Sequence, residues 1–255
     1  AWRARKNVDG PATWKVLRTG VVLAAIVAPI QIFVGDLHGL VALENQPAKI
    51  AAVEGIWETE KGAPLTLFGF PDEEARTTHF AIEVPKLASI ILTHHVDGEL
   101  KGLNEFEDAH PPVAPLFWSF RVMVGMGFLM LAVAWWGSYA LFRNKVGPWL
   151  LRALSWMTFA GWVASLAGWY VTEIGRQPWV VQGYIRASEV VADHAGGMVL
   201  STLIGYLLLY AFLLVFYILT LMHMSSKPAR SLKESIDFAA PKANTPKPIA
   251  TLGAV

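Results

Sequence analysis

The segment 46–57 combines a cation and a carboxylate with apolar residues, a set that could bind a ring and move a proton. Proline at a first helical position before alanine-rich sequence predicts a short helix, which Gly55 weakens at its end. At 100° per residue, Lys49 and Glu54 flank an apolar strip formed by Ile50, Val53 and Trp57. Such a strip could hold a quinol ring while Glu54 accepts a hydroxyl proton. The alternative is a surface helix whose polar residues face water.

A second candidate lies at Phe120-Arg121-Val122-Met123, near one end of an apolar stretch. A methionine thioether on a membrane helix can be an axial haem ligand, and Arg121 could pair with a haem propionate. The alternative is that Met123 fills the core and that Arg121 extends to the membrane interface.

A third candidate comprises Trp169, Glu173 and Arg176, which are spaced at i, i+4 and i+7. This spacing predicts that they share one face of a helix until Pro178 ends it. An ionisable pair at the edge of the hydrocarbon region, below a tryptophan, is a functional candidate. The alternative is an interfacial ion pair that ends the helix.

Composition indicates that a membrane protein positions these residues. Charged residues make up 16% of the chain and hydrophobic residues 54%, against about 25% charged in ordinary soluble domains. The mean hydropathy is +0.42. The net charge of +1 argues against a nucleic-acid partner, and the absence of cysteine excludes disulfides, iron–sulfur clusters and thiol catalysis. Any metal ligands must be His, Met or carboxylates.

Four stretches are apolar and long enough to cross a bilayer as helices. We expect an all-α membrane protein in which these four helices are part of a larger helical bundle. A large hydrophilic loop with thirteen acidic and five basic residues, and thus a net charge of −8, separates the first two spans. The expected order is a lead-in 1–18, spans 19–40, 112–142, 149–174 and 195–224, loops 41–111 and 175–194, and a tail 225–255.

Lysine and arginine gather before the first span, between the second and third, and after the fourth. The positive-inside rule then predicts that both termini are cytoplasmic and that the two loops face the periplasm of a bacterium. The protein would lie in the cytoplasmic (inner) membrane, surrounded by the lipid bilayer. The proline-rich tail is expected to be disordered.

The histidines lie away from the middle of the membrane. His38, His194 and His223 fall at span ends, and the other four are in the large loop. If haem is bound, at least one histidine ligand must come from sequence that is absent from this chain.

Together these segments resemble subunit I of cytochrome bd quinol oxidases. Five motifs follow in the family's order and at compatible places in the topology, which is far more specific than any one of them. They are Gly35-Asp36-Leu37-His38-Gly39; Gln46-Pro47-Ala48-Lys49 with Ala51-Ala52-Val53-Glu54-Gly55 and Trp57; Leu67-Phe68-Gly69-Phe70-Pro71-Asp72; Phe120-Arg121-Val122-Met123; and Glu173-Ile174-Gly175-Arg176-Gln177-Pro178-Trp179.

The resemblance covers nearly the whole chain but only the C-terminal half of the family's subunit I. It implies further N-terminal helices, absent here, that supply histidine ligands of the low-spin haem and of a high-spin haem. The segment between Asp72 and Met123 is short, as in the branch of the family that contains cyanide-insensitive oxidases.

The resemblance also implies roles for the candidate residues. Lys49 and Glu54 would belong to the quinol-oxidising loop. Met123 would be an axial ligand of the low-spin haem b, with Arg121 close to that haem.

At the high-spin haem pair, the resemblance implies that Glu173 is an iron ligand and that Arg176 supports it. Trp169 would lie between haems. Which high-spin haem Glu173 serves is open, and so is whether the pair is haem b with haem d or has a haem b in its place.

The mechanism so implied is that quinol reduces the low-spin haem and releases protons outside, while the high-spin pair reduces oxygen with cytoplasmic protons. Such an oxidase generates membrane potential without pumping and is paired with a second large membrane subunit (subunit II). Two other functions are possible: a quinone-reactive b-type cytochrome subunit of another complex, and a non-catalytic assembly partner for a separate N-terminal half.

Overall fold

The computed structural model describes residues 1–6, 10–106, 109–192 and 195–226. The chain divides into two compact units, Ala1–Val191 and Ala192–Val255, and each is described by itself. The tail that was expected to be disordered lies, from residue 227 onward, outside the described residues.

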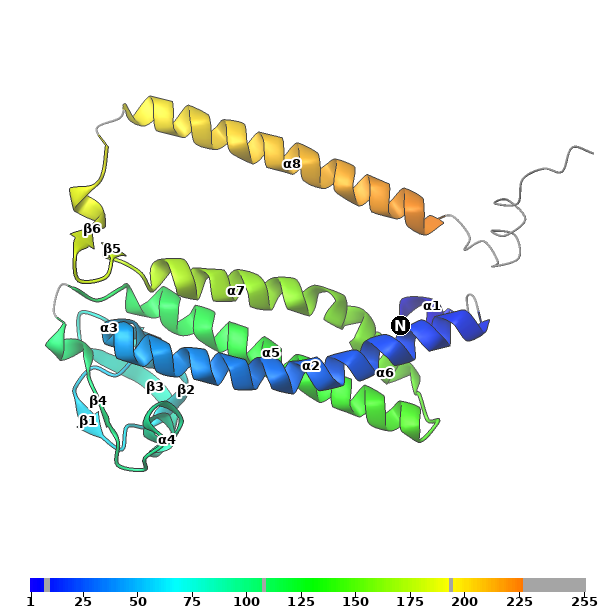
Figure 1. Ribbon diagram of the computed structural model, residues 1–255, viewed down its shortest axis with the longest axis horizontal. Coiled ribbons are helices and arrows are strands. Elements are labelled where there is room, and N and C mark those ends of the chain that lie inside the picture. Colours follow the sequence, from blue (N-terminus) through cyan, green and yellow to red (C-terminus); the bar gives the residue numbers. More distant parts are fainter. Residues whose placement is uncertain (7–9, 107–108, 193–194, 227–255) are drawn as a thin grey trace, which may run out of the picture. The chain divides into compact units, whose positions relative to one another are not determined.

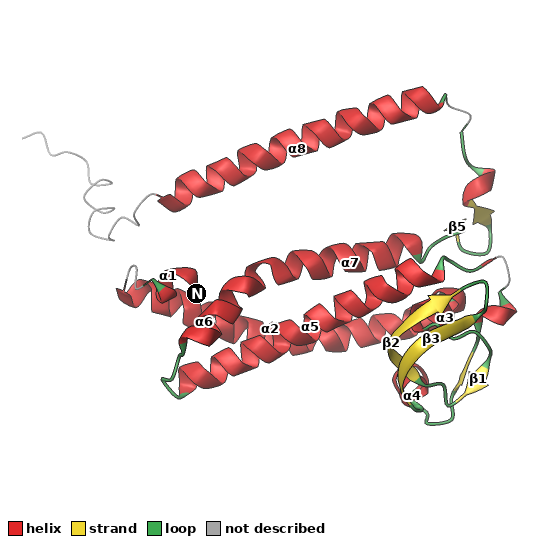
Figure 2. Cartoon of the chain, turned by 180° about the vertical axis from the view of Figure 1, so that it is seen from behind, coloured by secondary structure: helices red, strands yellow, loops and turns green. Residues whose placement is uncertain are grey.

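Three long helices form the body of the first unit. They run along one another, with α2 against α5 and α5 against α7 (Figures 1 and 2). The helix α7 is preceded by α6 and by a 3₁₀ turn, η3, and the short helix α1 packs on α6. Their bounds are α1 Trp2–Arg5, α2 Gly10–Asn45, α5 Val113–Phe142, α6 Pro148–Trp156, η3 Met157–Phe159 and α7 Ala160–Ile174.

The prediction of a mostly helical membrane protein with four spans is confirmed. Within the described residues, four helical stretches are long and apolar enough to cross a membrane: Gly10–Asn45, Val113–Phe142, Pro148–Ile174 and Gly196–Met224. The first helix is longer than the predicted 19–40. It ends at Asn45 because the residue before a proline, here Gln46, is disfavoured in helical geometry.

The segment between α2 and α5 is folded, as expected, and it contains strands that the sequence did not predict. The strand β1 pairs with β4, and β2 pairs antiparallel with β3 to form a hairpin. This region gathers at one end of the helices (Figure 2). Its elements are α3 Pro47–Glu54, β1 Glu60–Lys61, β2 Leu65–Asp72, β3 Thr77–Val84, α4 Leu87–Thr93, β4 Glu99–Leu100 and a 3₁₀ turn η1 Leu103–Glu105.

A short hairpin also follows α7, made of β5 Trp179–Val181 and β6 Ile185–Arg186, with a 3₁₀ turn η4 at Ala187–Glu189. The second unit contains the helix α8, Gly196–Ser226, whose apolar stretch has a mean hydropathy of 2.4. His194 lies outside the described residues.

The hydrophobic core at the loop end of the first unit holds α3 in place. Buried residues of α3, α5 and α7 meet there: Ala51, Ala52, Val53, Val113, Leu116 and Val171, together with Leu103 of η1. The removal of this apolar surface from water fixes α3 against both long helices. The core therefore brings the first candidate segment next to the other two.

Candidate functional site

Glu54 is the last residue of α3, and its carboxylate is enclosed by protein. The residue is 5% exposed, and its Oε2 lies 3.8 Å from Nη2 of Arg121 on α5. Among the described residues, Oε2 has no hydrogen-bond partner. Burial raises the pKa of the Glu54 carboxyl to about 7, because the charged form loses its hydration, and the Arg121 cation acts in the opposite direction. The Glu54 carboxyl is therefore much less acidic than that of an exposed glutamate.

Arg121 joins three elements at this carboxylate. Its Nη1 donates hydrogen bonds to the carbonyl oxygens of Val53 (2.7 Å) and Phe117 (3.0 Å). Its Nε donates to the Thr66 carbonyl at 3.0 Å, and Nη2 donates to the same oxygen. The guanidinium carbon also lies 3.2 Å from the centre of the Phe117 ring. Arg121 thus ties α5 to α3 and β2, while its expected contact with haem stays a prediction.

The apolar strip predicted along α3 is not an open surface, and this expectation was wrong. Val53 is 3% exposed and Ile50 is also buried, since α3 packs against both α5 and α7. Trp57 lies beyond the end of α3 and donates a hydrogen bond from Nε1 to Oγ1 of Thr78, 2.9 Å away. Helical periodicity placed Ile50 and Val53 on one side of the helix but wrongly added Trp57, and it could not show that neighbouring helices cover this side.

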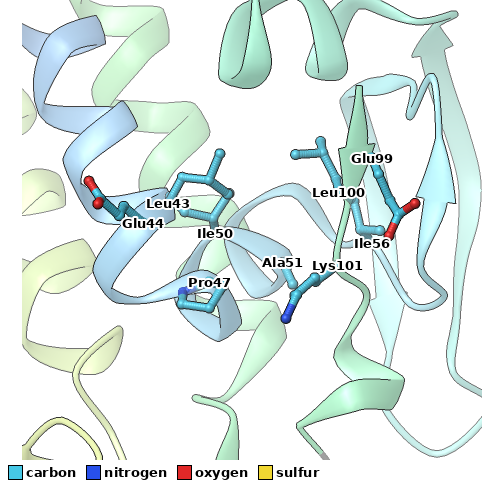
Figure 3. A pocket seen from close by; sticks show the side chains of 9 residues that line it. All are labelled: Leu43, Glu44, Pro47, Ile50, Ala51, Ile56, Glu99, Leu100 and Lys101. Atoms are coloured by element: carbon cyan, nitrogen blue, oxygen red, sulfur yellow. The ribbon is translucent and has the colours of Figure 1, made fainter. Parts of the chain in front are cut away.

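One face of α3 lines a pocket of about 240 Å³ (Figure 3). Its walls come from the end of α2, from α3 and the residue Ile56 that follows it, and from the segment around β4: Leu43, Glu44, Pro47, Ile50, Ala51, Ile56, Glu99, Leu100 and Lys101. Neither Lys49 nor Glu54 lines this pocket. The pocket is therefore separate from the pair that was predicted to carry proton chemistry.

Lys49 extends from α3 toward the end of α7. Its Cε lies 2.7 Å from the position that a Cβ on Gly175 would take, so the Lys49 side chain passes close to the backbone at the end of α7. Burial lowers the pKa of the Lys49 ammonium, the Arg176 cation lowers it further, and Glu173 opposes them. The structure thus brings Lys49 near Glu173 and Arg176, a proximity that the sequence did not predict.

Trp169 and Glu173 both lie on α7 and are exposed; Trp169 is 57% exposed. The helix ends at Ile174, so Arg176 lies in the following turn. The expectation that the helix would continue to Pro178 and present all three residues on one face was therefore wrong. Among the described residues, no ion pair within 4 Å joins Glu173 to Arg176, and the carboxylate stays open to another partner.

Met123 is half-buried on α5 and faces α7. Its Sδ lies 3.0 Å from the position that a Cβ on Gly168 would take. Within the described ranges, no three His, Asp or Glu residues gather as a metal site. The thioether of Met123 would suit a haem iron, and the exposed carboxylate of Glu173 would offer an oxygen ligand. Both ligand roles stay predictions.

Residues outside the five sequence motifs also support the site. Thr66, Glu73 and Thr78 belong to the β2–β3 hairpin and bond to Arg121, to the first residue of α5 and to Trp57 respectively. The only sequence signal nearby was the Leu67–Asp72 motif, which lies on β2 and its end. Its role as a support for the site becomes visible only in the fold.

A family model and two known proteins that resemble this chain all describe the same subunit. The family described as cytochrome bd terminal oxidase subunit I matches residues 1–229. Cytochrome bd ubiquinol oxidase subunit 1 of Bacillus subtilis (strain 168) is 35% identical over 194 residues, which cover 70% of this chain and 41% of the relative. Cytochrome bd-II ubiquinol oxidase subunit 1 of Escherichia coli (strain K12) is 26% identical over 260 residues, which cover 75% and 50%.

A solved structure shares the fold. The bd oxidase from Geobacillus thermodenitrificans matches with a TM-score of 0.79 and 33% identity, over 88% of this chain and 52% of the matched one. The chain spans about half the length, or somewhat less, of the relatives that it matches.

Proposed function

This chain belongs to the family of cytochrome bd terminal oxidase subunit I, and from this premise we propose that it takes part in the oxidation of quinol and the reduction of oxygen to water. Two quinols and one oxygen molecule give two quinones and two waters, so four electrons and four protons leave the quinols. The observation that carries the proposal is the buried carboxyl of Glu54, which lies beside Arg121. Burial raises the pKa of this carboxyl to about 7.

A quinol can give up its electrons only as its hydroxyl protons leave. Glu54 is matched to that task, because a base works best when its pKa lies near the working pH. The Arg121 cation stabilises the carboxylate that must be present before each proton transfer. Lys49, on the same helix, would hold a ring oxygen but cannot accept its proton.

Bound haem would supply the one-electron chemistry that links quinol to oxygen. Met123 would hold the low-spin haem b, with Arg121 two residues away on the same helix, and Glu173 would hold one of the high-spin haems. The other high-spin haem is haem d or a haem b in its place. Arg176 would support Glu173, and Trp169 would lie between the haems.

The chain would work with the N-terminal half of subunit I, which carries histidine ligands, and with subunit II. The complex would lie in the bacterial cytoplasmic membrane with both ends of this chain in the cytoplasm and the loop 41–111 in the periplasm. Protons would then be released outside and consumed from inside, which generates membrane potential without pumping.

The test is to express the complete subunit with its partner and to record a reduced-minus-oxidised spectrum together with quinol-driven oxygen uptake. We expect low-spin and high-spin haem signals and oxygen uptake that needs quinol. Haem reduction by quinol without oxygen uptake would instead identify a quinone-reactive cytochrome of another complex. A complex that assembles but is not reduced by quinol would leave only an assembly role.

The raised pKa of Glu54 predicts how turnover depends on pH. Below pH 7 the carboxyl is mostly protonated and cannot act as a base, so quinol-driven oxygen uptake should rise as the pH increases through about 7. Rates measured from pH 5.5 to 8.5 in the wild type and in Glu54→Gln check this prediction. The rising limb should be absent from the variant, and the same limb in both proteins would assign it to another group.

Glu173→Ala should lower the content of high-spin haem and leave the low-spin haem reducible by quinol. Alanine has no carboxylate, so the proposed iron ligand at the end of α7 would be removed. The proposed ligand of the low-spin haem, Met123, lies on a different helix, α5, and would be kept. Extracted-haem analysis and reduced-minus-oxidised spectra measure both contents. Normal oxygen consumption with a full complement of high-spin haem would contradict the ligand role.

A further inference from the structure

Hydrogen bonds at three points fasten the β2–β3 hairpin to α5 and to the segment that follows α3. Arg121 of α5 donates to the carbonyl of Thr66 on β2, and the Trp57 indole donates to Oγ1 of Thr78 on β3. The third bond is at the turn between the strands, where Oε1 of Glu73 accepts from the backbone N–H of Val113 at 2.6 Å. Both strands and the turn are therefore fastened at separate points.

Glu73 supplies a hydrogen-bond acceptor for the first backbone N–H of α5. Val113 is the first residue of α5, and Pro112, which precedes it, gives no side-chain cap. The first backbone N–H groups of a helix have no partner within the helix, and a carboxylate there also meets the positive end of the helix dipole. Glu73 fills this role from 40 residues earlier in the chain.

The hairpin lies over the end of α3, where Glu54 is buried. Gly55, with a φ of 74°, ends α3 in the left-handed conformation. A Cβ on Gly55 would lie 3.2 Å from the Phe117 ring and 3.4 Å from Oγ1 of Thr78, so β3 and α5 both approach this point closely. Arg121 binds the Thr66 carbonyl and faces Glu54 with the same guanidinium.

Aromatic side chains pack the β2–β3 hairpin against α5. The rings of Phe68 and Phe70 on β2 lie 5.2 and 5.8 Å from the ring of Trp118, measured between centroids. Such contacts stabilise the packed position but, unlike the bond at Glu73, they have no single directional partner. The turn at Glu73 is thus where one side chain fixes the hairpin to the first residue of α5.

We propose that Glu73 is a positioning residue for quinol oxidation: through the first amide of α5 it holds the β2–β3 hairpin closed over Glu54 and keeps water from that carboxylate. The inference rests on the proposed role of Glu54 as the proton acceptor. The charged group that faces Glu54 is Arg121 of α5, and its bond to Thr66 makes its position depend on the hairpin as well.

The experiment uses Glu73→Ala, Glu73→Gln and Glu74→Ala in the complete, assembled oxidase. Glutamine keeps an acceptor oxygen, and Glu74 is an exposed neighbour in the same turn. In Glu73→Ala, amide hydrogen exchange of residues 65–84 should become about five-fold faster, the size of effect that the loss of a helix cap produces. The rising limb of quinol turnover should move from about pH 7 to lower pH, since hydration stabilises the carboxylate.

Glu73→Gln should stay close to the wild type in both measurements, and Glu74→Ala should be unchanged. Unaltered exchange in Glu73→Ala overturns the inference, and so does faster exchange without a shift of the limb. Failure of the proposed function would look different. In that case the wild type and Glu54→Gln would have the same pH profile, while the exchange data would still decide whether Glu73 holds the hairpin.

Discussion

Glu54→Gln in the complete oxidase is expected to slow quinol-driven oxygen uptake by about 10²- to 10⁴-fold, the usual contribution of a general base. Glutamine has nearly the same size as glutamate and keeps the buried site filled, so haem content should stay normal. The amide cannot accept the quinol proton, because its nitrogen is not basic and its oxygen is a far weaker base than a carboxylate. Oxygen uptake with quinol, measured at pH 7.5, gives the result.

An artificial donor that reduces the haems directly should bypass this defect. If oxygen uptake falls equally with quinol and with such a donor, the damage lies at the haems or in folding, and Glu54 is not the quinol base. Glu58→Gln is the matched control, since Glu58 is exposed in the same segment. Lys49→Ala should act differently: it should raise the apparent KM for quinol more than it lowers kcat, because a cation positions ring oxygens without taking their protons.

Met123→Leu is expected to abolish the low-spin haem signal or to convert it to high spin. Leucine keeps the volume of methionine in the contact with α7 but offers no donor atom to iron. The fold should therefore survive while the ligand is lost. The reduced-minus-oxidised spectrum of the purified complex is the measurement.

Met126→Leu provides the comparison, because Met126 is also half-buried on α5, three residues further along. It should keep the low-spin signal of the wild type. An unchanged low-spin spectrum in Met123→Leu would remove Met123 from the ligand set, and loss of the signal in both variants would point to disturbed packing of α5.

The spans could be predicted from the sequence because each helix satisfies its own backbone hydrogen bonds and its apolar length matches the bilayer. The short helix at Pro47–Glu54 was predicted for a similar local reason, from its proline start and its glycine end. The strands β2 and β3 were not predicted, since each has eight residues that mix apolar and polar types without a strict alternation.

The candidate residues could be named from motifs, but their partners could not. Glu54 pairs with Arg121 at a separation of 67 residues, and Lys49 reaches Gly175 across 126 residues. Such contacts depend on how α3 packs between α5 and α7, which no local pattern contains. The burial of Glu54, and with it the raised pKa, follows from the same packing.

The bonds from Arg121 to the carbonyls of Val53 and Thr66 span 68 and 55 residues of chain. During translation, at roughly 5–20 residues per second, about 3 to 14 s pass between the synthesis of Val53 and that of Arg121. Until α5 has left the ribosome, α3 and the hairpin have neither this anchor nor the amide of Val113. The segment that carries Glu54 therefore completes its folding only after α5 has been made.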